Sequence, residues 1–154
     1  MSNVGRRGVA CLAAFIALLG TSWAGDSLWG KVTEVKEATL VTLDYGSGSY
    51  PIRIVGIDAP RPGEPRAEEA RQLVAGLVLG KNARMRLARR GANGEMVCRL
   101  FTDDPVIGIK EVGVELLRAG LARRQADYDE KYGELAQAES EARAAKRGLW
   151  AAAK

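Results

Sequence analysis

The stretch RIVGIDAP, residues 53–60, decides the fold predicted for this chain. It continues a run in which Ile52 and Ile54 alternate with Arg53 and Val55, a pattern typical of a β-strand with two different faces. The acidic residue and the proline near its end are turn-forming types. The stretch therefore predicts a strand that ends in a turn.

On both sides of this stretch the hydrophobic pattern predicts further strands and helices. Strands are expected at residues 28–35, 39–43, 49–57, 83–90 and 95–101, with a hairpin turn at 91–94. Apolar residues spaced three and four apart predict helices at residues 64–79, 111–119 and 129–147, and a glycine follows each. Such a chain is a small α+β domain, and five short strands are enough to close a Greek-key barrel. The pattern by itself does not decide whether the barrel closes.

The composition describes one globular domain and excludes several kinds of active site. The chain has 154 residues, of which 47% are hydrophobic. It has no histidine, which excludes Ser-His-Asp and Cys-His nucleophilic sites and zinc bound by imidazole. Any metal would have to bind oxygen ligands, as calcium and magnesium do. Cys98 alternates with Met96 and Leu100 and is expected to be a buried, unreactive thiol.

The first 24 residues are predicted to be a signal peptide. An arginine pair at residues 6–7 precedes an apolar run at 9–19, and Ser-Trp-Ala ends at Ala24 as a cleavage site. The alternative is a membrane anchor, but the apolar run is shorter than the ~20 residues that span a bilayer. We therefore expect an exported protein, periplasmic or secreted after cleavage near Ala24, with one domain at residues 25–154 and no membrane contact once cleaved.

Positive charge is concentrated in the predicted hairpin. Residues 81–99 carry six basic side chains and one acidic one, whereas residues 25–80 carry six and eight, and residues 100–154 carry nine and ten. The six basic residues are Lys81, Arg84, Arg86, Arg89, Arg90 and Arg99. Strand alternation predicts that Arg84, Arg86 and Arg90 share one face. Two interpretations stay open: a phosphate-binding surface, or a solvated face that deters edge pairing, since this segment contains no aromatic residue to stack on bases.

Several short motifs, in this order and spacing, resemble the staphylococcal-nuclease-like (thermonuclease) family. They are RIVGIDAP at residues 53–60, LGK at 79–81, LRAGLA at 117–122 and GLW at 148–150. The resemblance runs from about Gly30 to Trp150. It implies a five-stranded OB-type β-barrel with three helices, which agrees with the predicted order of elements.

The resemblance also implies which positions should carry out catalysis. In active members, two aspartates help to hold calcium, a glutamate acts as general base or orients the attacking water, and two arginines bind the scissile phosphate. The first arginine matches Arg53 and the second aspartate matches Asp58. The first aspartate, the glutamate and the second arginine fall at Ala38, Arg61 and Glu95, so three of these five positions depart from the pattern.

Each departure removes a part that the chemistry requires. Loss of a general base typically costs ~10²–10⁴ in rate, and loss of one electrostatic stabiliser ~10²–10³. Glu37 and Glu64 are candidates to replace the missing carboxylates, although Glu37 would need a bulge to face the pocket. Arg61 and Glu95 look like exchanged charges, and we hypothesise that they form an ion pair across the former site. The alternative is two unrelated surface substitutions.

We therefore expect a catalytically inactive domain that acts as a binding module. Its ligand is expected to be nucleic acid or another polyanion, or else a protein partner. The expected nucleic-acid-binding residues are Arg53, Arg61, Arg84, Arg86 and Arg90, and no cofactor is needed. The alternative is a calcium-dependent phosphodiesterase that hydrolyses DNA or RNA, with Asp58 as a metal ligand and Glu37 or Glu64 as a substitute group.

Overall fold

The computed structural model describes residues 27–128 and 133–151. The predicted signal peptide and its cleavage site near Ala24 lie outside these residues, as do the first residues of the helix expected from residue 129. Within the described part of the chain, no helix is long and apolar enough to cross a membrane.

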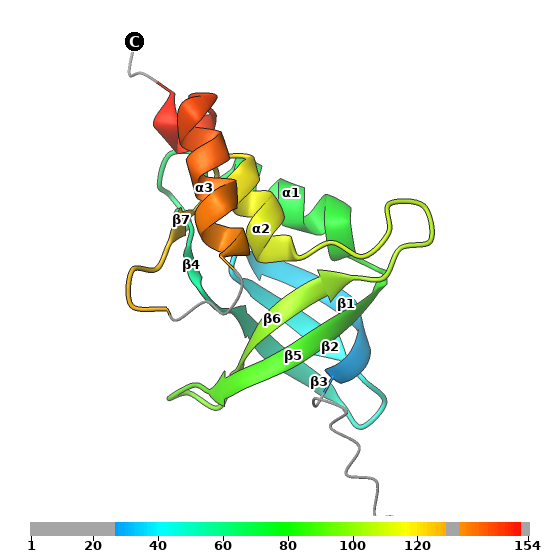
Figure 1. The fold of residues 1–154 in the computed structure, drawn as a ribbon. Coiled ribbons are helices and arrows are strands. Elements are labelled where there is room, and N and C mark those ends of the chain that lie inside the picture. The colour runs from blue at the N-terminus through cyan, green and yellow to red at the C-terminus, as the bar shows by residue number, and fades with distance from the viewer. Residues whose placement is uncertain (1–26, 129–132, 152–154) are drawn as a thin grey trace, which may run out of the picture.

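Five strands form a closed barrel, which confirms the predicted OB-type α+β fold (Figure 1). They are β1 (Ser27–Glu37), β2 (Leu40–Asp44), β3 (Ser49–Ile54), β5 (Asn82–Arg90) and β6 (Met96–Thr102). Around the barrel the order is β1-β2-β3-β6-β5, and every pair is antiparallel except β3 with β6. The inward residues alternate along each strand and form the core, which includes Val32, Val41, Leu43, Ile52, Met85 and Leu100.

The strand predicted at residues 49–57 is interrupted, and this interruption creates a second small sheet. β3 ends at Ile54, and β4 (Ile57–Asp58) pairs instead with β7 (Arg123–Arg124). Gly56 lies between them with φ +83°, and a Cβ at this position would come within 2.7 Å of Leu135 Cδ1. Glycine therefore permits both the left-handed backbone and the close approach that turn the chain away from the barrel.

Three helices cover one end of the barrel (Figure 1). They are α1 (Ala67–Val78), α2 (Val112–Arg118) and α3 (Glu134–Ala144), and a 3₁₀ turn (Gly148–Trp150) follows α3. Each helix buries the face that its apolar spacing predicts, with Ala70 and Val74 on α1 and Leu135 on α3 among the buried residues. α1 begins three residues later than predicted, because Pro65 and the left-handed Arg66 precede it.

A β-bulge in β5 changes which arginines share a face. Between Leu87 and Arg89 the strand gains one residue relative to β6, so Ala88 has no partner. Cross-strand partners lie on the same face of a sheet, and Arg89 is opposite Val97 whereas Arg90 is opposite the core residue Met96. The expectation that Arg90 lies with Arg84 and Arg86 is therefore wrong, and Arg89 takes its place.

Candidate functional site

The arginine that should bind phosphate is already paired with a carboxylate. Arg53 extends from β3, and Glu95 lies in the turn before β6, which is parallel to β3 here. Glu95 Oε1 is 3.5 Å from Arg53 Nε, and the Glu95 side chain is only 13% exposed. Its Oε2 accepts a hydrogen bond from the backbone N–H of Asn93 at 3.1 Å. A Cβ on Gly91 would collide with this carboxylate, so glycine leaves room for it.

Glu95 carries its negative charge at neutral pH. Hydrogen bonds from its own backbone N–H and from that of Asn93, together with Arg53, hold the pKa of the Glu95 carboxyl below its usual range. The hypothesis that Glu95 pairs with Arg61 is therefore wrong: among the ion pairs of the described residues, Glu95 joins Arg53 and none involves Arg61. The sequence has Arg61 and Glu95 where the family pattern expects a glutamate and an arginine, but the arginine that contacts Glu95 is Arg53 on β3.

Ala38 offers no ligand atom where the resemblance expects a carboxylate. It is 2% exposed and belongs to the hydrophobic core, at the turn between β1 and β2. Its neighbour Glu37 lines a cavity of about 450 Å³ with Glu64, on the α1 side of the loop. Asp58 does not line that cavity. β1 does have a register shift between Val35 and Glu37, but Glu37 does not line the pocket in which Asp58 lies.

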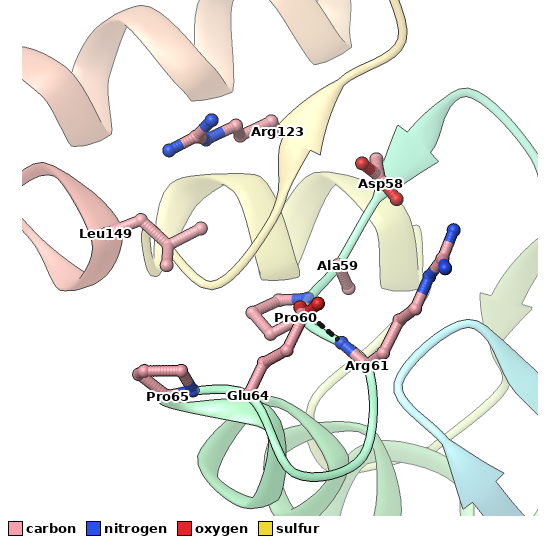
Figure 2. Close-up of a pocket in the computed structure, with 8 residues that line it drawn as sticks. All are labelled: Asp58, Ala59, Pro60, Arg61, Glu64, Pro65, Arg123 and Leu149. Atoms are coloured by element: carbon pink, nitrogen blue, oxygen red, sulfur yellow. Dashed lines mark hydrogen bonds between the residues drawn. The ribbon is translucent and has the colours of Figure 1, made fainter.

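Asp58, Arg61 and Glu64 line one open pocket of about 400 Å³ (Figure 2). The loop after β4 folds back, because Glu64 Oε2 accepts a hydrogen bond from the backbone N–H of Arg61 at 2.9 Å. Figure 2 shows the Asp58 carboxylate above this turn, with the Arg61 side chain extending upward beside it. Of the two candidate substitutes, Glu64 is thus the one that shares a pocket with Asp58, next to the positive charge of Arg61.

Arg123 also lines this pocket and was missed by sequence reasoning. It lies directly opposite Asp58 in the β4–β7 pair. Its guanidinium carbon is 5.4 Å from the centre of the Trp150 ring, and that of Arg143 is 4.1 Å from the same ring. Pairing between strands 65 residues apart brings Arg123 here, and no local pattern signals such a contact.

The pocket does not fit a calcium site. Calcium takes six to eight oxygen ligands, usually several of them carboxylates. Asp58 and Glu64 are the carboxylates that line the pocket, and Arg61 and Arg123 line it as well. Across residues 27–128 and 133–151, no three acidic, cysteine or histidine side chains are grouped closely enough to hold a metal ion. The residues that line the pocket therefore do not supply a calcium coordination shell.

The basic hairpin separates into paired and unpaired charges. Lys81 Nζ is 2.8 Å from Asp104, and Arg99 binds Glu111 through two contacts and Glu134 at 2.8 Å. These pairs lower the pKa of Asp104 to about 2, mainly through Lys81, and raise the pKa of Arg99. In contrast, no ion pair of the described residues involves the other four arginines, which are Arg84, Arg86, Arg89 and Arg90.

Two other predictions about this region have definite outcomes. Cys98 is fully buried, and burial raises the pKa of its thiol to about 11, as expected for an inert cysteine. Residues 81–99 contain no aromatic residue, but aromatic side chains of other strands lie beside this segment in the fold. Trp29 of β1 and Phe101 of β6 lie on either side of Arg84, with their ring centres 5.7 and 5.1 Å from its guanidinium carbon.

Comparison with known proteins agrees with the fold. The family model described as staphylococcal nuclease homologue matches residues 51–152. A probable endonuclease LCL3 of Verticillium alfalfae is 35% identical over 133 residues, which cover 79% of this chain and 45% of that protein. A probable staphylococcal-like nuclease CAN1 of Oryza sativa subsp. japonica is 31% identical over 105 residues, covering 68% of this chain and 30% of that protein. The chain thus spans half or less of these relatives, and it belongs to the staphylococcal nuclease homologue family.

Proposed function

We propose that this nuclease-like domain binds a polyanion, with nucleic acid as the leading candidate, and does not cleave it. The observation that carries the proposal is the contact between Glu95 and Arg53 at 3.5 Å. A phosphate that approached Arg53 would have to displace a carboxylate that is held by backbone hydrogen bonds and is negatively charged. The Glu95 carboxylate therefore competes with a phosphate for Arg53.

The other altered positions act in the same direction. Hydrolysis of a phosphodiester needs a group that readies water and positive charge that stabilises the transition state. Arg61 cannot take up a proton as a base does, and buried Ala38 supplies no oxygen ligand. Loss of the base alone costs ~10²–10⁴ in rate, and the further losses need not simply add to it.

Polyanion binding is supported by the arginines that have no acidic ion-pair partner among residues 27–128 and 133–151. Arg61 and Arg123 line the Asp58 pocket, and Arg84 and Arg86 lie on the outer face of the barrel. Guanidinium groups bind phosphate oxygens well, and such contacts weaken as salt concentration rises. A protein partner at the same surface is the competing proposal. Export, to the periplasm or medium after removal of residues 1–24, is likewise proposed from the sequence alone.

Metal-dependent hydrolysis is the second candidate. Two observations favour it: the relatives are named probable endonucleases, and Glu64 shares a pocket with Asp58. We rank it second because that pocket does not fit calcium and because Arg53 is paired with Glu95. In this alternative, Asp58 would bind the metal and Glu64 would replace the missing base.

The deciding experiment offers single-stranded DNA, duplex DNA and RNA to the purified protein, with calcium and with a chelator. We expect no cleavage in either condition, from protein whose circular dichroism shows that it is folded. We also expect binding to nucleic acid that weakens steeply with salt and ignores the chelator. Cleavage that needs calcium and is lost in Asp58→Ala would contradict the proposal, as would the absence of any salt-dependent binding.

A further inference from the structure

A row of three side chains crosses the outer face of the barrel on three adjacent strands. In the strand register, Trp29 of β1 is opposite Arg84 of β5, and Arg84 is opposite Phe101 of β6. The next outward row is Ser27, Arg86 and Arg99. Two residues along a strand separate the rows, a rise of about 7 Å. The face is thus a small grid of aromatic and cationic groups.

The members of the first row touch one another. The Arg84 guanidinium lies between the rings of Trp29 and Phe101, with 5.7 and 5.1 Å to their centres. The guanidinium carbon of Arg99 is 5.4 Å from the Phe101 ring centre, and Glu111 and Glu134 hold Arg99 in place. The charge of Arg99 is thus neutralised by Glu111 and Glu134, and Arg99 holds the Phe101 end of the row, where the helices pack on the barrel.

The opposite end of the row is open. Trp29 is 49% exposed although it is a large aromatic residue. Arg84 and Arg86 take part in none of the ion pairs found among the described residues. Together with Ser27, Arg99, Phe101 and Glu134, they line a cavity of about 170 Å³. An exposed ring thus lies beside a small basic cavity.

We infer that this face of β1, β5 and β6 binds single-stranded nucleic acid. A phosphate fits the chemistry of Arg84 and Arg86, and an unpaired base can stack on the exposed Trp29 ring. A duplex keeps its bases stacked on one another, so no base face is free to stack on Trp29. The inference deepens the proposed function, since it names the form of polyanion and a surface separate from the Asp58 pocket, and it holds whether or not that pocket cleaves.

The test is fluorescence anisotropy with a labelled thymidylate oligonucleotide and the purified protein. Trp29→Ala should weaken binding roughly 5- to 150-fold, the loss expected for one base-stacking contact, and Trp29→Phe should retain most of it. Arg84→Gln and Arg86→Gln should each lower the slope of log affinity against log salt by about 0.7. Arg71→Gln on α1 removes one positive charge outside this face, where Arg71 pairs with Glu68, and should leave affinity within about twofold.

The choice of probe distinguishes binding that includes base stacking from binding through phosphate charge alone. An oligonucleotide of abasic sites has the same phosphates without bases, and it should bind as weakly to wild type as the thymidylate strand binds to Trp29→Ala. Binding of inorganic polyphosphate or duplex DNA as tight as that of the single strand would overturn the inference. So would single-strand binding that Arg61→Gln abolishes and Trp29→Ala leaves intact, and in that case the proposed function would stand without this surface. A thermal unfolding midpoint equal to wild type shows that each variant is folded.

Discussion

Replacing Glu111 with glutamine should destabilise the domain by about 3 kcal/mol. Glu111 and Arg99 form a bidentate contact in which the two side chains are only 6% and 13% exposed. Removing one partner of a buried ion pair costs roughly 3–5 kcal/mol, because the other charge is left buried without compensation. We expect the lower end of this range, because Glu134 keeps one contact with Arg99 at 2.8 Å.

Urea denaturation followed by tryptophan fluorescence measures this cost. For a domain of this size the urea dependence is about 1–3 kcal/mol per molar, so the midpoint should fall by roughly 1–3 M. The matched control is Glu134→Gln, which removes the other carboxylate from the same arginine. Its side chain is 54% exposed, so the loss should stay below about 1 kcal/mol. Equal effects of the two substitutions would refute the claim that Arg99 is a buried anchor.

Three further predictions concern single groups. Glu95→Gln should tighten the binding of inorganic phosphate severalfold, because it removes a negative charge 3.5 Å from Arg53. Isothermal titration measures this affinity, and an unchanged value would show that Glu95 does not compete with phosphate for Arg53. Asp104→Asn should lower the free energy of unfolding at neutral pH but change it little at about pH 2. Lys81 and loop N–H groups lower the pKa of Asp104 to about 2. The stabilisation by this carboxylate is therefore fully present above about pH 4 and is lost as the pH falls towards about 2. Denaturation at both pH values checks this, and an equal loss at both would contradict it. Cys98 should react with a thiol reagent only on unfolding, since a pKa of about 11 leaves roughly one thiolate in 10⁴ at neutral pH. Fast labelling of the native protein would contradict the assignment of Cys98 as a buried, unreactive thiol.

Local patterns predicted the strands and helices well because each element has its own periodic signal, whereas the closed barrel was implied by the family resemblance. The alternation around Ile52 and Ile54 and the three-four spacing in α1 directly reflect which face is buried. Errors occurred where a single residue breaks a period. Gly56 splits one predicted strand into β3 and β4, and Ala88 inserts a bulge that moves Arg90 off the expected face.

The site was harder to predict because its contacts join distant segments. The departures at Ala38, Arg61 and Glu95 are visible in the sequence, but the partner of Glu95 depends on the parallel pairing of β3 with β6. Pairing of β4 with β7 likewise brings Arg123 to Asp58.

The aromatic neighbours of Arg84 show the same limit. Trp29 precedes it by 55 residues, and only the β1–β5 register places the two together. Charge counts along the chain identified the basic hairpin. They could not show that Lys81 and Arg99 are neutralised by Asp104 and Glu111.

The most direct test of the central claim compares wild type with a variant that carries Ala38→Asp, Arg61→Glu and Glu95→Arg. These changes restore the residue types that the resemblance expects and release Arg53 from its carboxylate. Both proteins are assayed for calcium-dependent cleavage of single-stranded DNA at a temperature at which circular dichroism shows each of them to be folded, because a carboxylate at the buried position 38 should lower the unfolding midpoint of the variant. The account predicts cleavage by the variant and none by wild type. Calcium-dependent cleavage by wild type that is lost in Asp58→Ala would contradict it.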